Sequence, residues 1–219
     1  MFSRVLSFTR TQRAAVLGAV GVVSTTSWTY LHNPVTAESE KTRIVVIGGG
    51  TAGITVSSQL LKKDKDIDIT VVDGSKYHYY QPAWTLVGAG LYDYEDTRRE
   101  MRRVVEDAGA DLLPENVNKI RPDENKIVTT SGREVQYDYL VVAAGMTTDW
   151  TALPGLKENI GKNGVVSNYD GGEATHQAIQ ALDTGSPQQI LFTFPATPVK
   201  CGGAPQKVMY LAQEYWQDK

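Results

Sequence analysis

Residues 42–53, with the sequence Thr-Arg-Ile-Val-Val-Ile-Gly-Gly-Gly-Thr-Ala-Gly, decide the fold of this 219-residue chain. The continuous apolar, β-branched run over 42–47 is typical of a strand that is buried on both faces. Glycines follow it, and residues 54–62 have the pattern of a helix. A second short apolar run, 69–72, ends at Asp73-Gly74. The segment therefore predicts a strand, a crossover helix and a second, parallel strand.

The glycines follow a G-x-G-x-x-G pattern, which is typical of turns that bind dinucleotides. Gly48 permits the tight turn, Gly50 lets a pyrophosphate approach the backbone, and Gly53 lets the helix pack closely on the strand. The helix amino terminus offers N–H groups and a positive dipole end to the phosphates. Asp73 ends the second strand about 20 residues beyond Gly53, where a carboxylate can accept hydrogen bonds from ribose hydroxyls. This pattern alone does not distinguish NAD from FAD.

The stretch that follows indicates how the rest of the sheet is built. Residues 77–94 predict a long ordered loop, and residues 96–108 predict a charged helix. Short strand-like runs separated by turn residues then predict a small β-meander, at 111–113, 117–120, 126–130 and 134–136. Another buried strand is expected over 139–144, ending in Ala143-Ala144-Gly145.

This last strand is the feature that separates FAD from NAD. An apolar strand that follows a β-meander and runs into Ala-Ala-Gly145 resembles the second conserved sequence of two-dinucleotide-binding-domain flavoproteins. The resemblance implies that Gly145 lies near bound FAD. The alternative is an additional sheet strand that is merely capped by a glycine.

The strand–helix rhythm restarts after an irregular segment, 146–164. Strands are expected at 165–167 and 190–194, and helices at 172–182 and 204–217. Two strands are too few for a second doubly wound sheet, so the chain resembles an amino-terminal fragment. The predicted fold class is α/β: a Rossmann-like FAD-binding domain with an inserted β-meander over 41–160, followed by the start of a second Rossmann-like domain over 161–219.

The amino-terminal residues differ in composition from the rest of the chain. Residues 1–37 contain no Asp or Glu, but they carry Arg4, Arg10 and Arg13 among many Ser and Thr residues. We interpret residues 1–40 as a mitochondrial transit peptide. A cleaved secretory signal is the second interpretation, and a membrane anchor retained over 14–31 is the third.

Composition excludes several other classes of protein. The net charge of −3 gives no support for nucleic-acid binding. The single cysteine, Cys201, excludes a disulfide within the chain and a zinc cluster of thiolates. No two of the three histidines have the spacing of metal ligands, so we expect no metal site. His78 could relay protons near a flavin, although a structural or solvated role is usual for a loop histidine.

Two longer blocks indicate a particular family. Residues 79–90 (YYQPAWTLVGAG) and 197–207 (TPVKCGGAPQK) closely resemble the corresponding segments of eukaryotic sulfide:quinone oxidoreductases, and the resemblance covers residues 42–219. It implies that the cofactor is FAD. It also implies that FAD contacts Asp73, already named above, and four other residues: Thr51, Ala52, Gln81 and Val117.

Cys201 is the candidate catalytic residue. It precedes Gly202-Gly203, and Pro205 suits the first turn of the helix that follows. A position ahead of a helix amino terminus and beside Lys200 favours the thiolate, which is the nucleophilic form. A buried, inert thiol is the usual alternative for a lone cysteine. The resemblance implies that Cys201 carries a persulfide sulfur.

The same resemblance implies the reaction and its partners. Hydrogen sulfide is oxidised, two electrons pass through FAD to a quinone such as ubiquinone, and a small thiol or sulfite takes the sulfur. The family's second redox cysteine and its membrane-binding end belong to a carboxy-terminal part that these residues lack, and the expected location is the mitochondrial inner membrane.

Two alternatives remain at this point. A quinone-reducing NADH dehydrogenase-like enzyme would need a second glycine-rich nucleotide turn, but residues 190–194 are followed by Pro195-Ala196-Thr197. The other alternative is a truncated, inactive FAD-binding module.

Overall fold

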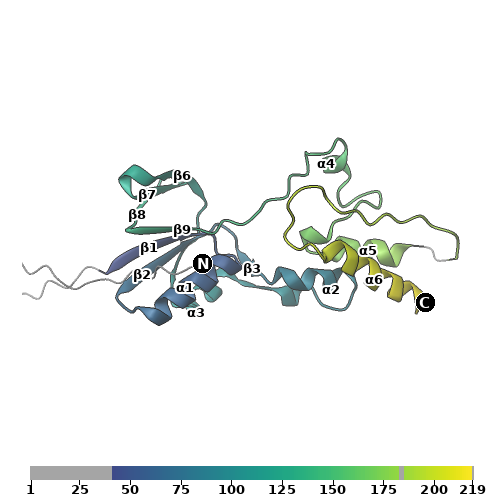
Figure 1. The fold of residues 1–219 in the computed structure, drawn as a ribbon, viewed down its shortest axis with the longest axis horizontal. Helices are drawn as coiled ribbons and strands as arrows, with labels where there is room; N and C mark the ends of the chain where they lie inside the picture. The colour runs from purple at the N-terminus through teal and green to yellow at the C-terminus, as the bar shows by residue number, and fades with distance from the viewer. Residues whose placement is uncertain (1–40, 183–184, 219) are drawn as a thin grey trace, which may run out of the picture. The chain divides into compact units, whose positions relative to one another are not determined.

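A computed structural model of the protein describes residues 41–182 and 185–218 (Figure 1). The transit peptide predicted over residues 1–40 lies outside the described residues. Within the described ranges, no helix combines the length and the apolar character that crossing a bilayer requires.

A four-stranded parallel sheet supports the glycine turn. Its strands lie in the order β5 (Asp111–Leu113), β2 (Ile67–Val72), β1 (Thr42–Ile47) and β9 (Tyr139–Val142). Ile44 of β1 lies opposite Ile69 of β2 on one side and opposite Tyr139 of β9 on the other. The last four residues of β1 are buried, as expected of a central strand covered on both faces. The predicted strand–helix–strand unit is confirmed.

Two helices cover one face of this sheet (Figure 1). They are α1 (Thr51–Lys63) and α3 (Met101–Asp107). Successive residues of a strand point to opposite faces, so Ile44 and Val46 of β1 face these helices while Val45 and Ile47 face away. Side chains from the strands and both helices form one apolar cluster: Ile44, Val46, Ile67, Ile69, Val71, Met101, Val105 and Ala110, with Ile54, Leu60 and Leu61 packed against it.

A three-stranded antiparallel sheet covers the opposite face. It consists of β6 (Val117–Arg121), β7 (Lys126–Thr129) and β8 (Glu134–Gln136). Asn125 turns the chain between β6 and β7 with a φ of 48°, a left-handed conformation that asparagine tolerates. Ile127 of β7 is fully buried against Val45 and Val72 of the parallel sheet. Three of the four strands predicted for the β-meander are therefore confirmed, and they form the second layer of the core. The fourth, at 111–113, is instead β5 of the parallel sheet, where it pairs with β2.

The predicted loop and charged helix between β2 and β5 need correction. Residues 77–79 form β3 (Tyr77–Tyr79), which pairs antiparallel with β4 (Arg98–Glu100). The helix predicted over 96–108 therefore begins only at Met101. The charged residues of β4 follow a helical pattern, but their pairing with a strand some 20 residues earlier overrides that local preference.

Two helices of the later part of the chain, α5 (Glu173–Ala181) and α6 (Ala204–Gln217), pack on a short helix from the predicted loop, α2 (Trp84–Gly88). The one-turn helix α4 (Leu156–Asn159) precedes them in the chain. α2 contacts both α5 and α6. The Trp216 indole N–H donates to the Ile179 carbonyl at 3.1 Å and links α6 to α5. The helices predicted at 172–182 and 204–217 are thus confirmed.

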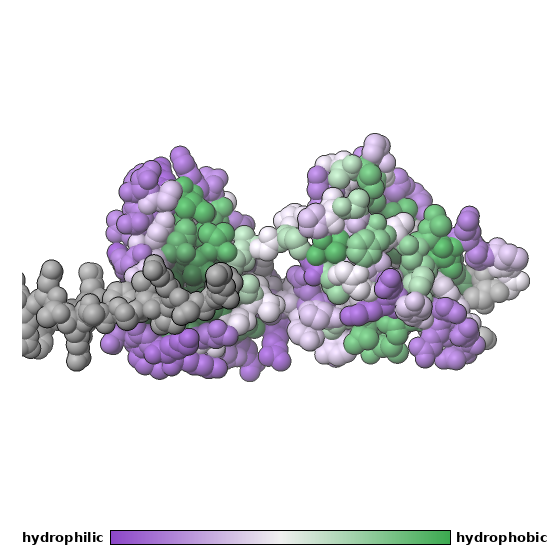
Figure 2. Space-filling view, in the orientation of Figure 1, coloured by the Kyte–Doolittle hydropathy of each residue, from purple (hydrophilic) through white to green (hydrophobic). Residues whose placement is uncertain are grey.

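The strands predicted at 165–167 and 190–194 are wrong. Val165 makes a single isolated bridge with Lys162, and residues 190–194 enter no ladder. A strand is stable where neighbouring strands satisfy its backbone groups, and the described residues provide no such neighbour here. Leu191 and Phe194 accordingly remain 79% and 57% exposed, and Figure 2 shows apolar patches uncovered on one face of the molecule. The second Rossmann-like domain over 161–219 stays a prediction: its two predicted helices are present, and its two predicted strands, which both fall within the described residues, are not.

The layered core gives a stability prediction. Substitution Ile127→Ala should lower the free energy of unfolding by about 2 to 5 kcal/mol, because it leaves a cavity between the β-meander and the parallel sheet. Ile120→Ala is the matched control, since Ile120 pairs with Ile127 but is 38% exposed; it should cost less than about 1 kcal/mol. Urea unfolding followed by circular dichroism measures both. Equal losses for the two variants would contradict the proposed two-layer packing.

Candidate functional site

The glycine turn joins β1 to α1 at the carboxyl edge of the parallel sheet. Gly48 has a φ of 102°, and its N–H donates to the Val72 carbonyl at 3.0 Å. A Cβ atom on Gly48 would lie only 2.4 Å from the Ala143 carbonyl oxygen, just beyond the end of β9. Glycine is therefore required at 48 by both conformation and space. The glycine turn, which is predicted to bind the dinucleotide, thus lies against the Ala143-Ala144 segment, which leads to the predicted contact Gly145.

Gly53 and Gly50 have different surroundings, which match their different predicted roles. A Cβ atom on Gly53 would lie 1.9 Å from the Gly48 carbonyl oxygen, so only glycine lets α1 start this close to β1. Gly50 precedes the first residue of α1, and a Cβ atom there would meet nothing within 4 Å. Thr51 and Ala52 are exposed in the first turn of α1, where backbone N–H groups have no partner within the helix. The turn thus has one packed side and one open side.

Asp73 is held by the turn itself. Its Oδ2 accepts a hydrogen bond from the Gly49 N–H at 2.7 Å, and its Oδ1 accepts one from the Ser75 N–H at 2.7 Å. An ionised carboxylate has about four acceptor positions, so two such bonds leave capacity for ribose hydroxyls. The ribose contact remains a prediction. The bond to Gly49 is a second role of Asp73 that the motif alone did not indicate.

Two residues outside the motif also contact Gly49, and sequence reasoning assigned them no role in the turn. A Cβ atom on Gly49 would lie 2.5 Å from the Met101 sulfur, so the start of α3 packs on the turn. The His78 Nδ1 lies 2.8 Å from the Gly49 carbonyl oxygen. The packing of β3 and α3 brings these two residues to the turn. Their spacing in the sequence does not reveal this contact.

The remaining predicted cofactor contacts occupy different positions. Gly145 has a φ of 74° and is exposed two residues beyond Ala143. Val117 begins β6, directly after Asn116, and a Cβ atom on Gly74 would lie 2.7 Å from the Asn116 amide. Gly145 and Val117 are therefore next to segments that contact the turn or the loop after Asp73. Gln81 is exposed in the 3-10 turn that follows β3.

Cys201 lies in the helical part of the structure. The residue is exposed and lies three positions before α6. Its backbone carbonyl accepts hydrogen bonds from the Tyr169 hydroxyl at 2.9 Å and from the Ala204 N–H at 3.3 Å. Lys200 is near the ring of Trp84, with 5.4 Å between Nζ and the ring centroid. The hydrogen bonds of Cys201 connect it to Tyr169 and to the start of α6, and its neighbour Lys200 lies near α2; the glycine turn is not among these partners. The structure therefore does not bring the two predicted sites together by direct contact.

Trp84 links this loop to β3. Its ring packs edge-on against Tyr79, with 5.9 Å between centroids, and Tyr79 stacks on Tyr94 at 5.8 Å. Burial raises the pKa of Tyr94, and its hydrogen bond with Tyr79 raises it further. Packing is thus the role that the contacts of Trp84 support.

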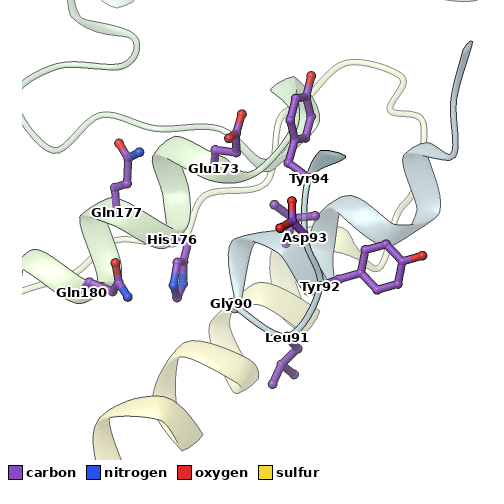
Figure 3. A pocket seen from close by; sticks show the side chains of 10 residues that line it. Gly90, Leu91, Tyr92, Asp93, Tyr94, Glu173, His176, Gln177 and Gln180 are labelled. Atoms are coloured by element: carbon purple, nitrogen blue, oxygen red, sulfur yellow. The ribbon is translucent and has the colours of Figure 1, made fainter. Parts of the chain in front are cut away.

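A separate groove of about 550 Å³ lies between α5 and the segment after α2 (Figure 3). Its lining consists of Val87, Gly90, Leu91, Tyr92, Asp93, Tyr94, Glu173, His176, Gln177 and Gln180. His176 packs so closely that a Cβ atom on Gly90 would lie 2.1 Å from its Cε1, and its ring lies edge-on to Tyr215 at 6.0 Å. The groove contains no residue of the glycine turn. Among the described residues, no group of His, Cys, Asp and Glu could hold a metal ion.

Comparison with known proteins places this geometry in a family. The chain is 45% identical to the mitochondrial sulfide:quinone oxidoreductase of Dictyostelium discoideum over 80% of its own length and 38% of that protein. It is 42% identical to the enzyme of the same name from Schizosaccharomyces pombe, over 80% of this chain and 42% of that protein. It thus spans about two-fifths of the length of these relatives.

The fold has a match among solved structures. The sulfide:quinone oxidoreductase of Aquifex aeolicus superimposes with a TM-score of 0.55 at 27% identity, over 64% of this chain and 32% of that one. The family model for pyridine nucleotide-disulphide oxidoreductases matches residues 42–182, from the first residue of β1 to the residue after α5. Since this match covers more than half of the sequence, the chain belongs to the pyridine nucleotide-disulphide oxidoreductase family.

Proposed function

We propose that this chain forms the FAD-binding part of a flavoprotein that oxidises hydrogen sulfide and delivers the electrons to a quinone. The observation that carries the proposal is the meeting of the glycine turn, Asp73 and the Ala143-Ala144 segment at the carboxyl edge of the parallel sheet. Ligands of such sheets bind at that edge. The names of the relatives supply the substrate class.

The turn has the chemistry that a dinucleotide pyrophosphate needs. The open side at Gly50 admits a phosphate to within contact of the backbone. The first turn of α1 supplies N–H donors and the positive end of the helix dipole. Asp73 retains acceptor capacity for ribose hydroxyls. FAD, when bound, supplies the transfer of two electrons from sulfur to quinone.

Cys201 is proposed to accept the sulfur. In a disulfide between Cys201 and a second cysteine, the sulfur of HS⁻ forms a bond to the Cys201 sulfur while the disulfide bond breaks. Cys201 then carries a persulfide, and the second cysteine leaves as a thiolate. Cys201 is the only cysteine of these 219 residues, so the second cysteine must come from outside them. The exposure of Cys201 supports access by sulfide and by an acceptor, for which we propose a small thiol or sulfite.

A mitochondrial location accompanies this proposal. The two relatives from Dictyostelium discoideum and Schizosaccharomyces pombe are named mitochondrial, and the acid-free, arginine-bearing composition of residues 1–37 agrees with import. We propose association with the inner membrane, where a quinone such as ubiquinone is the electron acceptor. Contact with the membrane surface is assigned to a part of the enzyme outside these residues.

Substitution Gly50→Ala tests the cofactor site. It should weaken FAD binding at least about tenfold, because the methyl group occupies the open side of the turn without disturbing the fold. Gly202→Ala is the matched control, since a Cβ atom there also meets nothing within 4 Å. Both variants should unfold at the temperature of the parent. Titration of flavin fluorescence measures the affinities, and identical affinities for Gly50→Ala and the parent would contradict a pyrophosphate site at the turn.

Substitution Cys201→Ser tests the sulfur chemistry. Sulfide-dependent reduction of a soluble ubiquinone analogue should be lost while FAD remains bound, because serine cannot form a persulfide. The assay is run on protein that extends beyond Lys219 far enough to include the second cysteine, because the proposed step needs a disulfide and the 219 residues alone should be inactive with either residue at 201.

Comparable activity in the parent and the Cys201→Ser protein would refute the role of Cys201. Bleaching of the flavin by NADH instead of sulfide would favour an NADH dehydrogenase-like enzyme.

A further inference from the structure

His78 points toward the glycine turn because of its place in β3. Side chains of a strand alternate between its two faces. Tyr77 and Tyr79 lie on one face, where Arg98 stacks over Tyr77 at 4.4 Å from the ring centroid. His78 is on the other face, and its Nδ1 lies 2.8 Å from the Gly49 carbonyl oxygen. β3 thus directs a single imidazole to the second glycine of the turn.

The direction of this hydrogen bond is determined by its acceptor. A carbonyl oxygen can only accept, so the imidazole carries a proton on Nδ1 and donates it. The Gly49 N–H is also engaged, since it donates to the Asp73 Oδ2 at 2.7 Å. Gly49 is therefore held on both sides, by an acidic residue through its N–H and by a histidine through its carbonyl.

The carbonyl of Gly49 belongs to the same peptide unit as the N–H of Gly50. No peptide bond among the described residues is cis, and in a planar trans unit these two groups point in opposite directions. Holding the carbonyl toward His78 therefore directs the Gly50 N–H away from it. Both flanking residues are glycines, so without this bond the peptide unit has unusual freedom to rotate.

We propose that His78 is a positioning residue for the pyrophosphate-binding turn. By holding the Gly49 carbonyl, it keeps the Gly50 N–H directed for a phosphate oxygen on the open side of the turn. The inference rests on the proposed function, because it assumes that FAD binds there. His78 acts through Gly49 and makes no contact with the cofactor in this account.

A purely structural role in holding β3 has less support. β3 pairs with β4 along its whole length. The chain on either side is tied down as well, by the Met101 N–H bonded to the Lys76 carbonyl at 2.9 Å and the Tyr80 N–H bonded to the Thr97 carbonyl at 2.7 Å. β3 therefore has its own attachments, and the hydrogen bond from His78 mainly restrains the turn.

The test compares three variants of the whole chain by FAD titration. His78→Phe keeps an aromatic ring but removes the donor, and it should weaken FAD binding about five- to tenfold, the effect of one hydrogen bond. His78→Asn places an amide N–H near the position of Nδ1 and should restore the affinity to within about threefold of the parent. Tyr77→Phe, which alters the opposite face of β3, is the control and should bind like the parent.

A second readout does not depend on FAD. In the His78→Phe protein without cofactor, the Gly49 amide, which is bonded to the Asp73 Oδ2, should exchange its hydrogen faster than in the parent, because the turn is less restrained, while amides of β1 should not change. Equal affinities for the parent and His78→Phe would overturn the role of His78, as would an Asn variant as weak as the Phe variant. A parent chain that binds no FAD would instead overturn the proposed function, so the two failures are distinguishable.

Discussion

The closeness of α1 to the end of β1 is the constraint on which the rest of the structure depends. A side chain at Gly53 would overlap the Gly48 carbonyl oxygen, and a side chain at Gly48 would overlap the backbone of Ala143. Because neither glycine has a Cβ atom, helix α1, the central strand β1 and the end of β9 can meet at one point. The same arrangement leaves Gly50 facing open space. Packing on one side of the turn thus creates an approach for a phosphate on the other.

Two layers hold this point in place. α1 and α3 pack on one face of the parallel sheet, and the β-meander packs on the other. Each layer also sends a residue to the site: Met101 from α3 lies against Gly49 of the turn, and Asn116 before β6 lies against Gly74 in the loop that follows Asp73. Asp73 connects them, because it ends β2 and accepts a hydrogen bond from Gly49. The packing of the core therefore determines the geometry of the candidate site.

Local patterns were sufficient to predict much of this arrangement. The apolar run of β1, the glycine spacing and the acidic end of β2 are all contained in about thirty residues, and each has a direct physical meaning. The β-meander was also predictable, because its strands are short and separated by turn residues. What local patterns could not reveal was pairing between distant segments. β4 reads as part of a charged helix until β3 pairs with it.

The same limit explains the errors after residue 160 and the residues missed at the site. Residues 190–194 have the composition of a buried strand, but composition does not provide a neighbouring strand. His78 and Met101 contact Gly49 only because β3 and α3 pack where they do. The family resemblance identifies Cys201, and two contacts place its loop among the helical elements: the hydrogen bond from Tyr169 to Cys201 and the packing of Lys200 on Trp84.

Hydrogen exchange at the backbone amides of residues 49–52, measured with and without FAD, tests the central claim most directly. The account predicts that FAD slows exchange at Gly50 and in the first turn of α1, because those N–H groups have an open side on which to meet the pyrophosphate. Amides of β1 serve as an internal reference, since they are already bonded within the sheet. FAD binding without any protection of residues 50–52 would contradict the account, because the cofactor would then lie elsewhere.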